Sequence, residues 1–140
     1  MTLVLGSPLY MAPELVKREV YTEKIDVWSL GVISYQLLSG KTPFESRSIK
    51  KIDFNICNKE VEFRNSSQEN WADISGEAKD FIMQCLNRDQ AKRPSVKELF
   101  DHPWIANYLE QKFNQPMGHA SEITYSIQKN LIKHKELSQF

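Results

Sequence analysis

The most regular hydrophobic pattern in the chain runs from residue 23 to residue 39. Apolar positions recur there at steps of three and four residues, which is the spacing of one face of an α-helix. They are Val27, Leu30, Ile33, Leu37 and Leu38. Gly40 and Pro43 follow and are typical of a helix end. Because Trp28, Val32 and Tyr35 add apolar surface on the other side, we predict a central helix that needs neighbours on every face.

Shorter helical patterns lie on the C-terminal side of this helix. Isoleucines at positions 49, 52 and 56 predict a helix within residues 46–57, and the polar residues 58–70 predict a loop. Ser75 is placed to cap a third helix. The apolar stripe of that helix consists of Ala78, Phe81, Ile82, Cys85 and Leu86.

The two ends of the chain have weaker patterns. Residues 1–22 predict an extended loop and a helical turn after Pro13. Ser95 and Glu98 have the spacing of a capping box, in which each side chain accepts the other's backbone N–H, and they predict a short helix. Residues 102–104 predict a turn, residues 106–120 a linker, and residues 121–140 an amphipathic helix. No strand or internal repeat is predicted, so the fold class is mainly α.

Composition and charge narrow the class of protein. The 140 residues are 41% hydrophobic and 26% charged, which fits one soluble globular domain. Eighteen basic residues balance 18 acidic ones, which argues against nucleic acid or an anionic membrane as a partner. The longest apolar stretch is far shorter than a bilayer span of about 20 residues. Two cysteines and no signal peptide favour the cytoplasm, and the histidines show no metal-ligand spacing.

Three sequence blocks resemble one family of enzymes. Residues 6–14, Gly-Ser-Pro-Leu-Tyr-Met-Ala-Pro-Glu, resemble the end of the activation segment of eukaryotic protein kinases. Residues 26–32, Asp-Val-Trp-Ser-Leu-Gly-Val, resemble the start of the central helix of the kinase C-terminal lobe (C-lobe). Lys-Arg-Pro at 92–94 and His-Pro-Trp-Ile at 102–105 resemble the last helix of that lobe. The blocks stand in the family's order, so the resemblance implies a partial kinase domain over residues 1–105.

Finer features of these blocks point to a subgroup. The Gly-Ser-x-x-Tyr-x-Ala-Pro-Glu form is similar to that of serine/threonine kinases. Residues 74–82 and the His-Pro-Trp-Ile block look most like the calcium-dependent and calmodulin-dependent kinases. In that group an autoinhibitory junction follows the kinase domain, and residues 123–140 resemble one. The basic amphipathic segment 121–140 thus has two candidate docking partners, a calmodulin-like domain and the kinase lobe, and the alternative is a solvated terminal helix.

The resemblance also says which kinase parts to expect. In the family, the glycine-rich loop, the phosphate-binding lysine, the magnesium aspartate and the catalytic loop all precede Ala-Pro-Glu. Only 11 residues stand before Ala12, so we expect a helical C-lobe portion without the N-lobe, the catalytic loop or a cofactor site. ATP and Mg²⁺ are expected only for the full-length family member. Residues 53–55 and 87–89 look like the magnesium motif and the catalytic loop, but they lie on the wrong side of Glu14.

What remains by resemblance is the platform for a peptide substrate. Its substrate-binding residues are Val4, Gly6, Ser7, Pro8 and Met11. Val4, Pro8 and Met11 correspond to the pocket for the residue that follows the phosphoacceptor, and Ser7 corresponds to a residue beside the catalytic aspartate. For Val4 and Met11 taken alone, packing in the core is the alternative.

Further resemblances concern the supports of that platform. Glu14 and Arg93 correspond to a buried ion pair that ties the activation segment to the lobe. Asp26 corresponds to an anchor for the catalytic loop, and its alternative role is a favourable interaction with the helix dipole. Gln36 stands where kinases that prefer basic substrates often have glutamate. Gly31 is predicted to permit a close approach of the backbone to a neighbour.

Two functions follow as hypotheses. The first is the C-lobe part of a calcium-dependent type of serine/threonine kinase, which transfers the ATP γ-phosphate to protein hydroxyls when whole and is inactive alone. The second is a truncated, non-catalytic binding module that captures kinase substrates or regulatory partners.

Overall fold

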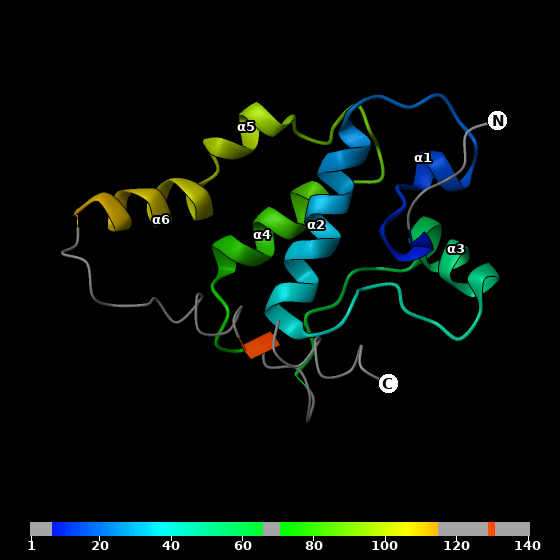
Figure 1. Ribbon diagram of the computed structural model, residues 1–140, viewed down its shortest axis with the longest axis horizontal. Coiled ribbons are helices and arrows are strands. Elements are labelled where there is room, and N and C mark those ends of the chain that lie inside the picture. The colour runs from blue at the N-terminus through cyan, green and yellow to red at the C-terminus, as the bar shows by residue number, and fades with distance from the viewer. Residues whose placement is uncertain (1–6, 66–70, 115–128, 131–140) are drawn as a thin grey trace.

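The described part of the chain is built from helices. The computed structural model describes residues 7–65, 71–114 and 129–130, and within these ranges it contains no strand, which confirms the mainly α class (Figure 1). A 3₁₀ helix, η1, is followed by six α-helices. They are η1 Pro8–Tyr10, α1 Pro13–Val16, α2 Lys24–Ser39, α3 Ile49–Asn58, α4 Gly76–Cys85, α5 Val96–Phe100 and α6 Pro103–Asn114.

Helix α2 forms the centre of the molecule. It runs beside α4, with α1 and α3 on one side and α5 and α6 on the other (Figure 1). The helix predicted for residues 23–39 is therefore confirmed, and it ends at Gly40, whose φ of 84° lies in the left-handed region that favours glycine. Leu30 and Ile33 are exposed, so the described residues do not cover α2 on every face.

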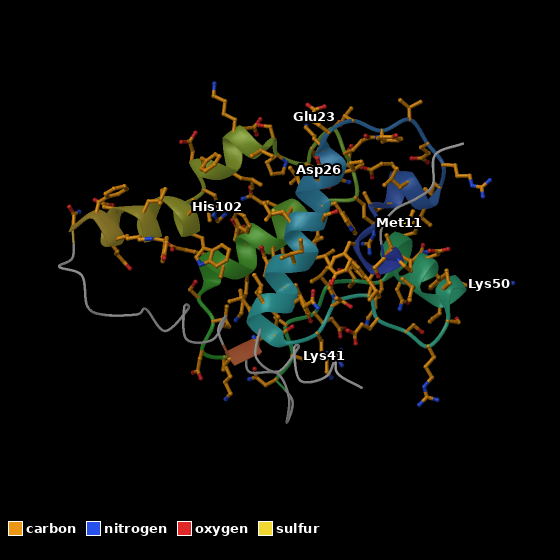
Figure 2. The ribbon with its side chains drawn as sticks, viewed as in Figure 1. Met11, Glu23, Asp26, Lys41, Lys50 and His102 are labelled. Carbon is orange, nitrogen blue, oxygen red and sulfur yellow. The ribbon has the colours of Figure 1, made fainter. Side chains whose placement is uncertain are left out.

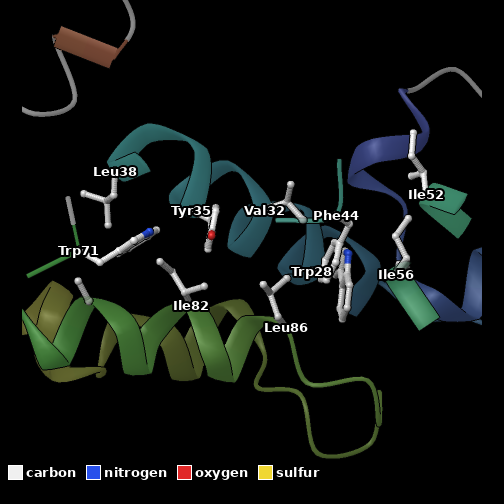
Figure 3. Close-up of a cluster of buried hydrophobic side chains, with 12 residues drawn as sticks. Trp28, Val32, Tyr35, Leu38, Phe44, Ile52, Ile56, Trp71, Ile82 and Leu86 are labelled. Atoms are coloured by element: carbon white, nitrogen blue, oxygen red, sulfur yellow. The ribbon is translucent and has the colours of Figure 1, made fainter. Parts of the chain in front are cut away.

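Aromatic side chains dominate the hydrophobic core along α2. The ring of Trp28 stacks on Phe44 with 5.6 Å between centroids, and the ring of Tyr35 lies 4.8 Å from that of Trp71. The Tyr35 hydroxyl donates to the Glu62 carbonyl at 2.9 Å, so the buried phenol keeps a hydrogen-bond partner. Figure 3 shows Ile82 of α4 and Leu86, which directly follows α4, facing these rings. The core thus joins α2, α4 and the long connections between the helices.

A glycine sets how closely α2 and α4 approach each other. A Cβ atom on Gly31 would lie 2.6 Å from the Cβ of Cys85 and 2.9 Å from a methyl carbon of Leu86. Both distances are shorter than a carbon–carbon contact allows. The prediction that Gly31 permits a close backbone approach is confirmed, and the neighbour is α4.

Serine caps fix the starts of three helices. Ser48, Ser75 and Ser95 each accept a backbone N–H from the residue three positions later, at the starts of α3, α4 and α5. This confirms the three predicted helices and moves the start of α3 to Ile49. The capping box differs in one detail. The carboxylate of Glu98 accepts the Ser95 hydroxyl at 3.2 Å, where a backbone N–H was expected.

Helix α6 corrects the sequence prediction. Residues 102–104 were predicted to form a turn and residues 106–120 a linker, but Pro103–Asn114 is one helix. Proline is well suited to a first helical position because its missing N–H is not needed there. Nδ1 of His102 accepts the backbone N–H of Trp104 at 3.1 Å and so caps the helix. The predicted segment 121–140 lies outside the described residues except for positions 129 and 130, which are helical.

Candidate functional site

Residues 7–14 are held against α2 by one residue from their middle. The Tyr10 carbonyl accepts the Ser29 hydroxyl at 3.0 Å, and the Tyr10 hydroxyl donates to the side-chain oxygen of Gln36 at 2.6 Å. Because Ser29 and Gln36 are seven positions apart on one helix, these bonds fix η1 at two points along α2. Helix η1 also packs against α3.

The structure describes three of the five residues that were predicted to form the substrate platform. Ser7 is exposed, and its side-chain oxygen accepts the Leu9 N–H at 3.4 Å, which caps η1. Pro8 starts η1, and Met11 follows it beside α3; both are half-buried (Figure 2). These three residues therefore lie on one short surface segment. Val4 and Gly6 lie outside the described residues.

The buried ion pair that the sequence suggested is present in the structure. Nη1 of Arg93 lies 2.6 Å from Oε1 of Glu14, and Nη2 lies 3.0 Å from Oε2. Both side chains are buried, with 0% and 2% exposed. The two parallel bonds match the planar guanidinium to the carboxylate, a geometry that lysine cannot offer.

Arg93 also binds two backbone carbonyls and an aromatic ring. Nη1 donates to the Lys24 carbonyl and Nε to the Asn87 carbonyl, both at 2.9 Å, and the guanidinium lies 5.3 Å from the centre of the Trp28 ring. One side chain thereby connects α1, the start of α2 and the loop before α5. These contacts satisfy the buried charge, which would otherwise be costly.

The charge state of Glu14 follows from this environment. Burial alone would raise the pKa of the carboxyl group, but the hydrogen bonds and the charge of Arg93 outweigh it. The pKa of Glu14 is therefore lowered from its ordinary value. The pair is ionised at neutral pH, and its stabilising contribution depends on that charge.

Asp26 lies in the first turn of α2 and is exposed (Figure 2). A carboxylate in the first turn of a helix interacts favourably with the helix dipole. This position agrees with the simpler of the two roles expected from the sequence, and its surface location leaves the carboxylate accessible.

Some residues that build the site have no sequence signal of their own. Arg88 donates to the carbonyls of Asn55, Ile56 and Lys59 at the end of α3, and so fixes that helix to the loop after α4. Arg88 belongs to segment 87–89, and its contacts agree with the interpretation of that segment as ordinary loop residues. The pairing of Tyr10 with Gln36 was likewise not foreseen, because only the folded chain brings the two together.

Three further kinds of feature were sought among the described residues: a metal-binding cluster, a membrane-spanning helix and a reactive cysteine. Among residues 7–65, 71–114 and 129–130, no group of three or more His, Cys, Asp or Glu side chains is placed to hold a metal ion. No helix within those ranges is long and apolar enough to cross a membrane. Burial raises the pKa of the Cys85 thiol to about 12, so that cysteine is unreactive at neutral pH.

The fold and the ion pair define the C-lobe of a protein kinase domain. The family model described as protein kinase domain matches residues 1–105, and the chain belongs to this family, in its serine/threonine branch. The chain is 43% identical over 101 residues to the mouse serine/threonine-protein kinase ULK3, an alignment that covers 71% of this chain and 20% of that protein.

Other relatives come from different kinase groups. The chain is 40% identical over 115 residues to calcium-dependent protein kinase 13 of Arabidopsis thaliana. That alignment covers 82% of this chain and 21% of that protein. It is 34% identical over 139 residues to a probable myosin light chain kinase of Dictyostelium discoideum. That alignment covers 96% of this chain and 42% of that protein. The chain thus spans from a fifth to about two fifths of these relatives. The comparisons establish the protein kinase family, but they do not establish the calcium-dependent subgroup.

Proposed function

We propose that this chain supplies the substrate platform of a serine/threonine protein kinase of calcium-dependent type. The complete enzyme transfers the γ-phosphate of ATP to serine and threonine hydroxyls of proteins. In this proposal Val4, Gly6, Ser7, Pro8 and Met11 bind the peptide around the phosphoacceptor. ATP and Mg²⁺ bind to other parts of the complete enzyme, and the location is the cytoplasm.

The observation that carries the proposal is the bidentate pair of Glu14 and Arg93, with distances of 2.6 and 3.0 Å. It fastens the segment that contains Ser7 and Met11 to the loop before α5. A peptide-binding segment needs such a support, because a platform that is ordered before the substrate arrives loses less entropy on binding. The two bonds from Tyr10 to α2 support the segment in the same way.

A chimeric kinase, called the grafted kinase below, tests the proposal. Residues 1–105 replace the corresponding segment of the Arabidopsis calcium-dependent protein kinase 13, which supplies the ATP-binding and catalytic parts. We expect the grafted kinase to phosphorylate a serine peptide in the presence of ATP and Mg²⁺. The matched control carries Arg93→Ala in the graft, which leaves the Glu14 carboxylate buried without its partner, and should lose most of the activity. A grafted kinase that folds, binds ATP and yet phosphorylates no peptide would contradict the proposal.

The calcium-dependent type rests on the basic amphipathic segment 121–140 and on the resemblance to calcium-dependent kinases. Segments with apolar residues at four-residue steps and nearby lysines bind the grooves of calmodulin-like domains. We expect calmodulin to bind the 140-residue chain in Ca²⁺ and to dissociate in a chelator, as measured by calorimetry. A Leu131→Asp variant should bind more weakly. Calmodulin binding that is equal with and without Ca²⁺, or absent, would contradict this part of the proposal.

A further inference from the structure

His102 lies between α5 and α6 and contacts α4 (Figure 2). Its side chain is 4% exposed, and its ring meets the ring of Phe81 edge-on, with 5.3 Å between the centroids. Nδ1 accepts the backbone N–H of Trp104 at 3.1 Å, and Nε2 lies 2.7 Å from Oδ2 of Asp80 on α4. Both ring nitrogens of this buried histidine therefore have a partner, one at the start of α6 and the other on α4.

These two contacts require the neutral form of the His102 ring. A nitrogen that accepts an N–H must offer a lone pair, so Nδ1 carries no proton. The proton of the neutral ring is then on Nε2, which donates it to the Asp80 carboxylate. A protonated ring has an N–H at both nitrogens, and its Nδ1–H would point at the N–H of Trp104. Protonation of His102 and capping of α6 therefore exclude each other.

Helix α6 depends on its first two turns for its attachment to the lobe. All of α6 lies in the described part of the chain, and none of its residues is buried, whereas α2, α3 and α4 each bury several side chains. It is held to α4 by the ring of Trp104, 4.9 Å from that of Phe81, and by the amide of Asn107, which donates to both carboxylate oxygens of Glu77 at 3.1 Å. Elements with few buried contacts open at a low cost in free energy. The loss of a cap should therefore be visible in α6.

The charged groups around His102 decide which of its bonds changes with pH. Among the described residues, Asp80 is the charged side chain that bonds to the ring, and the Gln84 amide donates to the same carboxylate oxygen at 2.8 Å. The other charged or titratable side chains of the three neighbouring helices and their ends are Glu77, Lys79 and Cys85 on α4, Lys97, Glu98 and Asp101 at α5, and Tyr108, Glu110 and Lys112 on α6. Nε2 keeps its proton in both charge states, so its bond to Asp80 can persist on protonation. The bond that protonation removes is the one from the Trp104 N–H.

We propose that His102 is a pH-sensitive switch for the start of α6, in which the neutral ring caps the helix and the protonated ring releases its first turn. Histidine is the residue type whose charge changes near neutral pH. The match to the protein kinase domain ends at residue 105, so α6 begins inside the matched domain and ends beyond it. The switch therefore acts at the end of the kinase domain.

Amide hydrogen exchange of the full 140-residue chain tests the switch. Protection factors, which correct for the intrinsic effect of pH on exchange, are measured by mass spectrometry for the first turns of α6 and for α2 at about pH 7.5 and about pH 5.5. We expect the protection of α6 to fall roughly fivefold at the lower pH, as for the loss of a helix cap, and that of α2 to stay unchanged. The matched variant is His102→Asn, whose side-chain oxygen caps a helix at either pH and which retains His119 and His134. Its α6 protection should be the same at both pH values.

A measurement on the parent chain keeps the test independent of any variant. The His102 ring is titrated by NMR, and its midpoint should coincide with the midpoint of the loss of α6 protection. A ring that gains its proton while α6 stays equally protected would overturn the proposal, and so would a ring that remains neutral down to about pH 5. An equal loss of α6 protection in His102→Asn would also overturn it, because another group would then be responsible.

Discussion

At the scale of single residues, Arg93 connects the segment of residues 7–14 to the rest of the lobe. Its side chain is completely buried and makes two bonds to Glu14 and one each to the carbonyls of Lys24 and Asn87. A buried pair of this kind contributes little net energy compared with an apolar replacement of both residues. Losing one partner is different, because the other charge then stays buried without compensation.

The first prediction concerns the loss of one partner of this ion pair. Arg93→Leu leaves the Glu14 carboxylate buried and should cost about 3 to 5 kcal/mol of unfolding free energy. For a chain of this size that lowers the melting temperature by roughly 10 to 20 °C. Thermal unfolding followed by circular dichroism measures it. Lys92→Leu is the matched control, since Lys92 is exposed, and should change the melting temperature little. An Arg93→Leu protein as stable as the parent would contradict the pairing.

The second prediction is the pH dependence of the same pair. The pKa of Glu14 is lowered in the folded chain, so the unfolded chain takes up the proton first as the pH falls. The stability from the charged pair is therefore complete above the ordinary pKa of 4.5 and is lost as the pH falls through the lower, folded value. The difference in melting temperature between the parent and Glu14→Gln should be constant from pH 7 to about pH 5 and should shrink below that. A difference that grows in acid would contradict this sign.

At this scale, a residue's contacts could be predicted from the sequence when the residue belongs to a recognisable motif. Glu14 and Arg93 each sit in a recognisable block, so their partnership could be proposed across 79 positions. The bond between Tyr10 and Gln36 could not be proposed, because neither residue type requires the other. Its existence depends on where η1 is placed along α2, which the tertiary fold decides.

At the scale of elements, the contact of α2 with α4 organises the lobe. Gly31 lets the two helices approach closely, and Val32, Tyr35, Ile82 and Leu86 fill the core beside the crossing. Helix α3 contributes Ile52 and Ile56 to the same core, and bonds from Arg88 also hold its end. The close crossing therefore depends on the absence of one side chain.

The third prediction uses the two helical glycines as a matched pair. Gly31→Ala places a methyl group 2.6 Å from the Cβ of Cys85, so the helices must move apart. Strain of this kind costs about 1 to 3 kcal/mol, which exceeds the gain of up to about 1 kcal/mol in helix propensity. Gly76→Ala meets no atom within 4 Å and should be neutral or slightly stabilising. Chemical denaturation compares both, and a stabilised Gly31→Ala would contradict the close crossing.

Most helices could be predicted from the sequence because the residues at their ends are recognisable capping and terminating residues. Ser48, Ser75 and Ser95 supply caps that are readable in the sequence, and Gly40 supplies a stop. The local pattern missed helix α6, although residues 102–105 resembled the last helix of the lobe, because its start uses a histidine cap, which is not among the usual capping residues. The His-Pro pair there predicted a turn, while in the folded chain the proline opens a helix.

At the scale of the whole molecule, the described residues belong to the helical C-lobe of the kinase domain. The glycine-rich loop and the catalytic motifs of a kinase have no counterpart in the 140 residues. The overall helical arrangement followed from sequence periodicity and family resemblance. The open face of α2 became visible only with the fold, because periodicity cannot say which apolar face finds a neighbour.

The fourth prediction is that the isolated 140-residue chain transfers no phosphate. The assay incubates it with radiolabelled ATP, Mg²⁺ and a serine peptide, and the expected signal equals that of a boiled sample. The grafted kinase described above serves as the positive control. Phosphotransfer by the pure chain, with a kinase contaminant excluded by mass spectrometry, would contradict the assignment of catalysis to other parts of the enzyme.

The central claim, that the segment around Ser7 and Met11 is a substrate platform, is tested most directly by steady-state kinetics of the grafted kinase. Met11→Asp should raise the KM for the peptide roughly tenfold, with kcat and the KM for ATP nearly unchanged, because it alters peptide binding alone. Val20→Asp, at a side chain that is 88% exposed, is the control and should change none of these three constants. An unchanged KM for the peptide in Met11→Asp would contradict the account.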